Sequence, residues 1–255
     1  MNRIRLLCLL IGLLPGACSS GSSSSVDGGG VSPDAGSPGV RVPAPPLLRQ
    51  FESGAEAMSE AARGLLPAHQ ARWDVAQSAY AADAALWPQV RPMVAAAGVA
   101  MATLEGIEAA LMAYAQDVQD QRQRDAETDA NKITNAVPDL FDSYEYNAPT
   151  DTLRLDGTFR QLQIEAEFAD WSNAQKWLDE TVAVWSRLKG VVEPAAPGRA
   201  DLMGAVTVVK DMEAVLAEAQ RLISAATHSA DDATALVSQA QRGLDLTDVC
   251  EQIFK

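Results

Sequence analysis

Residues 73–94, WDVAQSAYAADAALWPQVRPMV, and residues 171–192, WSNAQKWLDETVAVWSRLKGVV, decide the fold that this sequence predicts. All five tryptophans of the chain lie in these two stretches, which align at an offset of 98 positions. The identical pairs are Trp73/Trp171, Ala76/Ala174, Gln77/Gln175, Ala85/Ala183, Trp87/Trp185 and Val94/Val192. Composition alone rarely produces two tryptophan matches, so we interpret the pattern as an internal repeat of about a hundred residues.

Both stretches have apolar residues at steps of three and four positions, which places them on one face of a helix. The apolar series are Trp73, Ala76, Tyr80, Ala84, Trp87, Val90 and Val94, and then Trp171, Ala174, Leu178, Val182, Trp185, Leu188 and Val192. We expect the two tryptophan faces to meet near the centre of a bundle. Pro88 and Pro92 predict a bend or a break in the first copy.

The rest of the body continues the helical pattern and contains no alternating Val/Ile/Thr run, so strands are not expected. The predicted helices span residues 47–64, 67–87, 94–122, 125–145, 152–169, 171–189, 200–226 and 230–253. Asp170 and Ser229 are candidate N-caps. The sequence therefore predicts an all-α fold, an antiparallel helical bundle of two similar halves at about 47–148 and 149–255.

The N-terminus, MNRIRLLCLLIGLLPGAC, has the organisation of a signal peptide, with two basic residues before a short apolar run. Small residues and then Cys18 follow that run, and the segment resembles the lipobox of bacterial lipoproteins. Pro15 stands where that family usually has leucine. The resemblance implies cleavage after residue 17, a diacylglycerol on the Cys18 thiol and a further acyl chain, such as palmitate, on the freed amine. Two or three acyl chains anchor a protein stably.

Residues 19–46, SSGSSSSVDGGGVSPDAGSPGVRVPAPP, are low in complexity and cannot form a packed core. We expect residues 18–46 to be the lipidated cysteine and a disordered tether, which would reach at most about 90 Å. The resemblance also implies that Ser19 favours sorting to the outer membrane. The body, residues 47–255, would then face the periplasm or the cell surface.

The chain has 20 Lys and Arg residues against 34 Asp and Glu residues, a net charge of −14. Loss of Arg3 and Arg5 with the signal peptide would leave −16. Such a balance argues against nucleic acid as a partner, because neutralising phosphates requires clustered basic residues. The expected partners are the membrane, through the lipid, and another protein of the envelope.

Few residues offer catalytic chemistry. His69 and His228 are the two histidines, and each is interpreted as a surface or capping residue. Cys250, which would be the last unmodified thiol, is interpreted as a core residue. No nucleophile elbow, P-loop, dinucleotide fingerprint or C-x-x-C-H motif occurs. We therefore expect no enzyme, no cofactor and no metal.

The carboxylates do not predict a di-iron site, because the E-x-x-H motif that such a site requires does not occur. We interpret them as a solvated acidic face, and a weak calcium site among residues 117–129 stays open. Gln77 and Gln175 are expected to border the core, and a hydrogen bond between them or a ligand contact also stays open. The carboxylates weighed are Glu105, Glu108, Asp117, Asp120, Asp125, Glu127, Asp129, Glu165 and Glu167.

Three segments, ANKITNAVPDLFDSYEYNAP (130–149), LRLDGTFRQLQIEAEFADW (153–171) and WSRLKGVV (185–192), resemble small helical lipoproteins found across bacteria. The body is also similar to imelysin-like periplasmic proteins, which are duplicated helical bundles linked to metal uptake, but it lacks their G-x-H-x-x-E motif. We therefore expect a non-enzymatic, lipid-anchored envelope protein, a helical scaffold that binds a protein or a small ligand. The alternative is a solute- or metal-binding component of an envelope uptake system.

Overall fold

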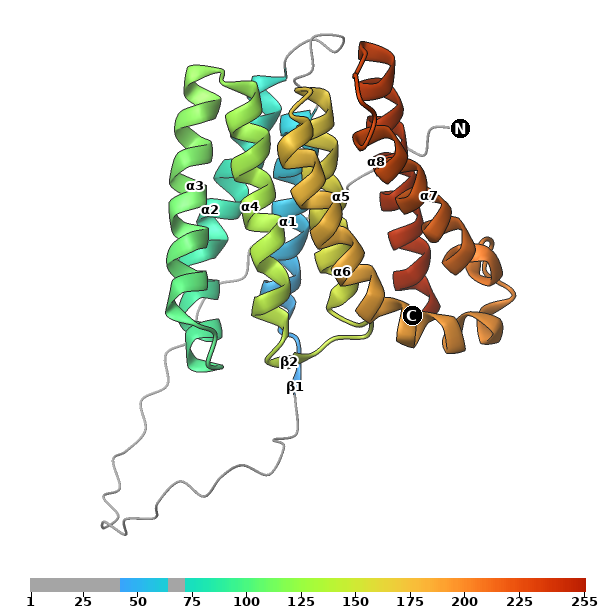
Figure 1. Ribbon diagram of the computed structural model, residues 1–255. Coiled ribbons are helices and arrows are strands. Elements are labelled where there is room, and N and C mark those ends of the chain that lie inside the picture. The colour runs from blue at the N-terminus through green and yellow to red at the C-terminus, as the bar shows by residue number, and fades with distance from the viewer. Residues whose placement is uncertain (1–41, 64–71) are drawn as a thin grey trace, which may run out of the picture. The chain divides into compact units, whose positions relative to one another are not determined.

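The computed structural model describes residues 42–63 and 72–255, and in these ranges the chain forms eight α-helices (Figure 1). This confirms the predicted all-α class. The helices are α1 (Pro46–Arg63), α2 (Trp73–Ala96), α3 (Met101–Asp120), α4 (Gln123–Phe141), α5 (Asp151–Glu167), α6 (Trp171–Ala195), α7 (Val208–Ile223) and α8 (Ala230–Ile253). Cys18, His69 and the predicted signal peptide lie outside the described residues.

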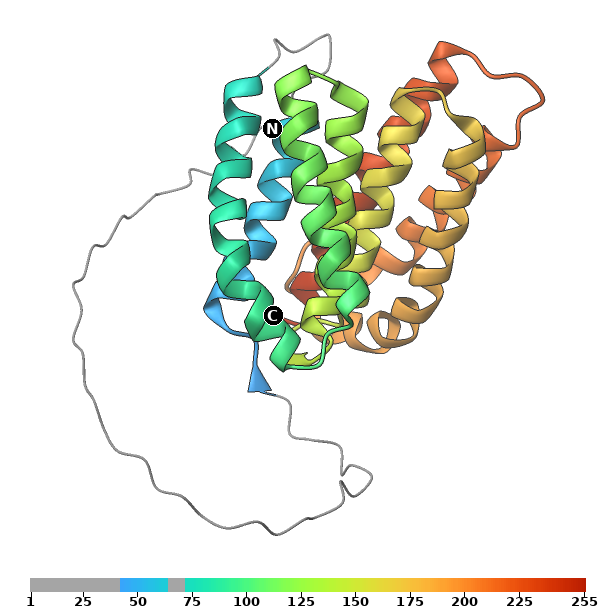
Figure 2. The same cartoon turned by 90° about the vertical axis from the view of Figure 1, so that its left-hand side faces the viewer.

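The helices pack as two sets of four with the same order of neighbours (Figures 1 and 2). In the first set α1 contacts α2 and α4, and α3 contacts the same two helices; α5 to α8 repeat this pattern. Buried apolar residues form one cluster from Ala44 to Tyr144 and a second from Leu155 to Ile253. This likeness is what a duplication would produce, although the internal repeat itself stays a prediction.

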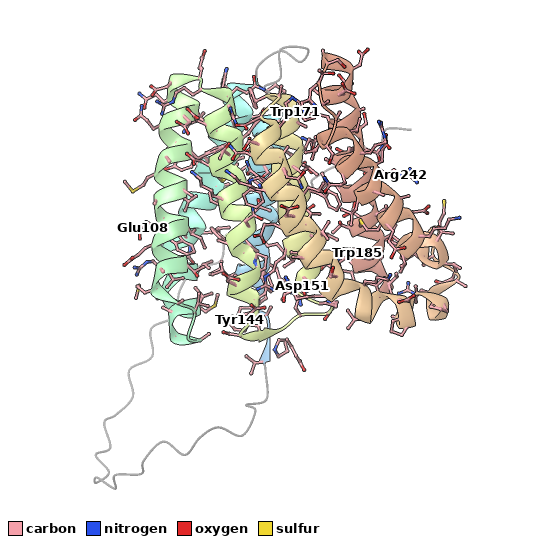
Figure 3. The ribbon with its side chains drawn as sticks, viewed as in Figure 1. Glu108, Tyr144, Asp151, Trp171, Trp185 and Arg242 are labelled. Atoms are coloured by element: carbon pink, nitrogen blue, oxygen red, sulfur yellow. The ribbon has the colours of Figure 1, made fainter. Side chains whose placement is uncertain are left out.

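The tryptophan faces do not meet. Trp87 lies in the first apolar cluster, with its ring 5.2 Å from that of Phe51, whereas Trp185 lies in the second cluster. Figure 3 shows Trp171 and Trp185 at two levels of the half formed by α5 to α8. The two halves join through α4 and α5 instead. The expectation of a central tryptophan contact was wrong because each apolar stripe is already covered by its own half.

The buried face of α2 also differs from the predicted stripe at one position. Ala84 and its counterpart Val182 are not buried, whereas Asp83 and its counterpart Thr181 have no exposed surface. Residue 83 continues the helical spacing from Ala76 to Trp87 as well as residue 84 does. The prediction chose position 84 because alanine is apolar, but the buried position is 83.

The prolines do not break their helices. The helix α2 continues through Pro88 and Pro92 to Ala96, and α6 continues through Pro194 to Ala195. All three prolines are exposed. A helix bends most easily on its solvent side, where water can satisfy the carbonyl that loses its partner. The break predicted after residue 87 was therefore wrong.

Both predicted caps are confirmed. The Asp170 carboxylate accepts a hydrogen bond from the Asn173 backbone N–H at 3.2 Å, and the Ser229 hydroxyl accepts one from the Asp232 N–H at 3.2 Å. The Asp232 carboxylate in turn accepts a hydrogen bond from the Ser229 N–H at 2.8 Å, which completes a capping box. These local bonds explain why the starts of α6 and α8 could be predicted from the sequence.

The body begins before the predicted residue 47. The short strand β1 (Val42–Pro43) pairs in parallel with β2 (Tyr144–Glu145), and the Ala44 N–H donates to the Glu145 carbonyl at 3.2 Å. This pairing fastens the start of the described chain to the segment between α4 and α5. In residues 42–63 and 72–255, none of the helices is both long and apolar enough to span a membrane.

Candidate functional site

Polar side chains are buried where α1, α4, α5 and α8 approach one another, and we call this region the seam. The helix α5 is covered by α4, α6 and α8, so it has almost no solvent face. The buried polar residues of these helices are Ser59, Glu127, Asp129, Asn131, Thr134, Thr152, Thr158, Arg160, Gln161, Gln163, Glu165 and Thr247. Because a buried polar group is costly without a partner, this concentration marks the region for attention.

In the middle of the seam, side-chain hydrogen bonds join α4 to α5 and to α1, although Oδ1 of Asn131 and Oε1 of Gln163 are buried without a partner. The Asn131 side-chain amide donates to the Gly157 carbonyl at 3.0 Å and to the Gln161 side-chain carbonyl at 2.9 Å. The hydroxyls of Ser59 and Thr134 lie 2.9 Å apart. Gly157 is needed here, because a Cβ at this position would lie 2.2 Å from Oδ1 of Asn135. These contacts hold α4 close to α1 and α5.

The lower end of the seam, near β1 and β2, contains a phenol between two carboxyls. The Tyr146 hydroxyl lies 3.1 Å from Oε1 of Glu52 and 2.8 Å from Oε1 of Glu251. A phenol has one proton, so it can donate to only one carboxylate at a time. Burial raises the pKa of Glu52 to about 7, and the Tyr146 hydrogen bond opposes that rise. Near neutral pH the Glu52 carboxyl therefore exchanges a proton with its surroundings.

Two narrow crevices meet at this end, and both are lined by Glu56, Leu153 and Asp156. One crevice opens beside Glu52 on α1, and the other opens beside Glu251 on α8. Burial and the Asp156 charge raise the pKa of Glu56 to about 7. Arg160 lies 2.6 Å from the Asp156 carboxylate and neutralises only part of the charge. The crevices therefore have mixed apolar and acidic walls.

A wider hollow of about 450 Å³ lies at the same end. Tyr144 and residues 146–151, with Arg154 and Phe254, line it, and Figure 3 shows Tyr144 and Asp151 there. The Arg154 guanidinium already pairs with Asp139 at 2.9 Å and with Asp142 at 2.5 Å. The positive charge of Arg154 is therefore already paired with carboxylates of the body.

The upper end of the seam brings Glu127 of α4 and Glu167 of α5 together. Burial raises the pKa of both carboxyls, that of Glu127 to about 8, and the positive charge of Arg63 opposes the rise. The Arg63 guanidinium donates to the Gln241 side chain at 2.9 Å. Two carboxyls in such a place share a proton more readily than they both ionise. The halves therefore meet at groups that respond to pH at both ends of the seam.

The interpretation of the carboxylates as a solvated face was wrong for several residues. Glu127 and Glu165 are buried, and Arg124 reaches the Glu165 carboxylate at 2.7 Å. The interpretation holds for Glu105 and Glu108, which are exposed on α3, with Arg91 3.5 Å from Glu108. The helix pattern could not show that α4 and α5 cover one another.

The stretch 117–129, where a calcium site was left open, is occupied by ion pairs. Arg122 contacts the carboxylates of Asp117, Asp120 and Asp125. Lys132 contacts Asp129 at 2.6 Å. In the part of the chain that the structure describes, no three His, Cys, Asp or Glu side chains are grouped so that they could hold a metal ion.

The other candidate residues are separated. His228 stacks on the Trp171 ring at a centroid distance of 3.9 Å. Cys250 is buried, as predicted, and burial raises the pKa of its thiol to about 12. Gln175 pairs with Gln220 of α7 at 3.0 Å, whereas Gln77 is exposed on α2, so these equivalent glutamines do not meet.

Sequence reasoning missed Glu52, Glu56 and Asp83. The first two lie four positions apart on α1, beside the apolar residues Phe51 and Ala55, and that spacing was a usable signal. Asp83 was detectable as an acid at a core position of a periodic helix. Their proximity to α5 or to α1, however, depends on contacts that are distant in sequence.

Comparison of the chain with protein-family models, with curated proteins and with solved structures found no match. Its function must therefore be argued from its own residues.

Proposed function

We propose that this chain is a non-enzymatic protein of the bacterial cell envelope, anchored by a lipid on Cys18, whose helical body binds a protein or a small ligand. The sequence pattern around Cys18 supports outer-membrane attachment, with the body facing the periplasm or the cell surface. One structural observation supports binding: the two acidic crevices that meet at Glu56 and Asp156. Carboxyl groups in a partly dry recess favour a positively charged group on the partner.

The anchor is tested by Cys18→Ser. This change removes the only thiol that the lipobox pattern offers for acylation, so we expect the variant to leave the membrane fraction and become freely extractable. Fractionation of cells with immunodetection measures the result, and Ser19→Ala serves as the matched control. Continued membrane association of Cys18→Ser would contradict the lipid anchor.

Binding at the crevices is tested by crosslinking in cells. A photoreactive amino acid in place of Leu153 lies between the two crevices, whereas one in place of Met112 lies on the exposed flank of α3. We expect a defined adduct from position 153 that is absent from position 112 and is lost in Glu56→Gln/Asp156→Asn. Identical adducts from both positions would refute a role for the crevices.

Metal analysis of the purified protein separates this proposal from the alternative of an uptake component. Stoichiometric iron, copper or calcium would contradict a plain binding scaffold.

A further inference from the structure

The end of the body where the described chain begins has apolar side chains that project into solvent. Figures 1 and 2 both show β1, the α2–α3 turn and the α6–α7 connection at this end, which we call the entry end. Its exposed apolar residues are Val42 (57% exposed), Met101 (53%), Met203 (90%) and Val206 (66%). They come from three separate connections.

The opposite end of the body is different. Its connections include Gln121-Arg122 between α3 and α4 and residues 224–229, SAATHS, between α7 and α8. The large apolar residue exposed there among the described positions is Phe168, at 36%, and the Arg124 guanidinium lies 5.3 Å from its ring centroid. Among the residues that the structure describes, apolar exposure is therefore concentrated at the entry end.

Met203 and Val206 project from a turn that the fold holds in place. Gly204 has a φ of 87°, a conformation that favours glycine and reverses the chain after Met203. Ala205 and Val208 are fully buried beside the exposed residues. Arg199 donates to the Gln252 carbonyl at 2.7 Å, which fastens the connection to α8. The exposed side chains are thus presented by an anchored loop.

The Met101 side chain projects from the same end as Met203 and Val206. Met101 is the first residue of α3, and Cα–Cβ bonds tilt toward the N-terminus of a helix. The N-terminus of α3 lies at the entry end (Figure 1). The tilt of the Cα–Cβ bond therefore directs the Met101 side chain outward from that end. Apolar side chains from different parts of the chain therefore project at one end.

We propose that the entry end docks on the lipid bilayer that holds the Cys18 anchor, with Met203 and Val206 inserted among the headgroups. This inference rests on the proposed anchor. The chain enters the body at this end, and the segment from Cys18 to Val42 can reach about 80 Å when extended, so the end can contact the bilayer. Apolar side chains that project from one end of a body can insert at a bilayer surface. Because the chain is acidic overall, the surface it fits is zwitterionic lipid.

The test uses the full, lipidated protein in phosphatidylcholine vesicles. An environment-sensitive fluorophore is attached to Met203→Cys or, as a control, to Met112→Cys, which replaces a methionine that is 69% exposed. Met112 follows Glu108 by four positions, on the flank of α3 that Figure 3 shows, and lies roughly 16 Å along the helix from Met101. Cys250 is buried, so labelling is selective.

Brominated lipids should quench the fluorophore at position 203 several-fold more strongly than at position 112. In protein labelled at Val206→Cys, the added change Met203→Asp should reduce quenching to the control level, whereas Met112→Asp should leave it unchanged. Protein that floats with the vesicles but shows equal quenching at both positions would overturn the docking and leave the anchor standing. Protein that does not float would overturn the anchor and, with it, the docking. A blue shift at position 203 without vesicles would assign the face to a protein contact and overturn the proposal.

Discussion

Asp83→Thr is expected to stabilise the body by on the order of 5 kcal/mol at pH 8. Asp83 has no exposed surface, and neither of its carboxyl oxygens has a hydrogen-bond partner. Burial raises its pKa from 3.8 to about 8. Thr181, which the predicted repeat aligns with Asp83, shows what such a position can accommodate, because the Thr181 hydroxyl donates to the Trp177 carbonyl at 2.7 Å. Threonine at position 83 can donate to the Ala79 carbonyl in the same way.

The effect should depend on pH in a defined direction. In the folded chain Asp83 keeps its proton up to a pH of about 8, whereas in the unfolded chain it ionises above 3.8. Folding therefore takes up a proton between these values, and the free energy of unfolding falls as the pH rises through that window. Glu52 and Glu56, with pKa values of about 7, act in the same direction.

Urea unfolding at pH 5 and pH 8 measures both effects. The natural chain should be less stable at pH 8, and the advantage of Asp83→Thr should grow between the two pH values. Asp74→Asn is the control, because Asp74 is exposed on the same helix and the change should shift stability by less than about 0.5 kcal/mol. An equal difference at both pH values would mean that Asp83 is already ionised in the fold.

Gly243→Ala is expected to destabilise the body by about 1–3 kcal/mol. A Cβ at position 243 of α8 would lie 2.3 Å from Cε1 of Phe159, which is fully buried on α5. The added methyl group must displace the ring or separate the two helices. Thermal or urea unfolding measures the loss.

Gly106→Ala is the matched control, with the opposite expected sign. A Cβ there meets nothing within 4 Å, so alanine should gain about 0.5–1 kcal/mol from its better helix propensity. Phe159→Leu provides a second check, because it should cost less in the Gly243→Ala background than in the natural chain. Additive effects of these two changes would contradict the predicted clash.

The sequence predicted helices well where their signals are local. The starts of α6 and α8 follow from the caps Asp170 and Ser229, and the buried series from Ala174 to Val192 follows largely from helical spacing. It failed at Pro88 because that proline is exposed, a fact that depends on how α2 is oriented in the fold.

Most of the candidate site could not be predicted. Glu127 and Glu167 are 40 positions apart, and Glu52 and Glu251 are almost 200 apart. In the sequence, each of them is an ordinary acid on a predicted helix. Only the packing of α1, α4, α5 and α8 shows that it lies in the seam. Helix periodicity shows which residues share a face, but not which neighbour covers it.

The sequence by itself determined the all-α class and the positions of most helices, because caps and apolar spacing act within a few residues. It also carries the lipobox-like pattern that leads to Cys18. Only the tertiary structure decided that the halves join through polar faces of α4 and α5, that Asp83 is buried, and that Met203 and Met101 project at one end. These features depend on contacts between segments far apart in the chain, which no local pattern encodes.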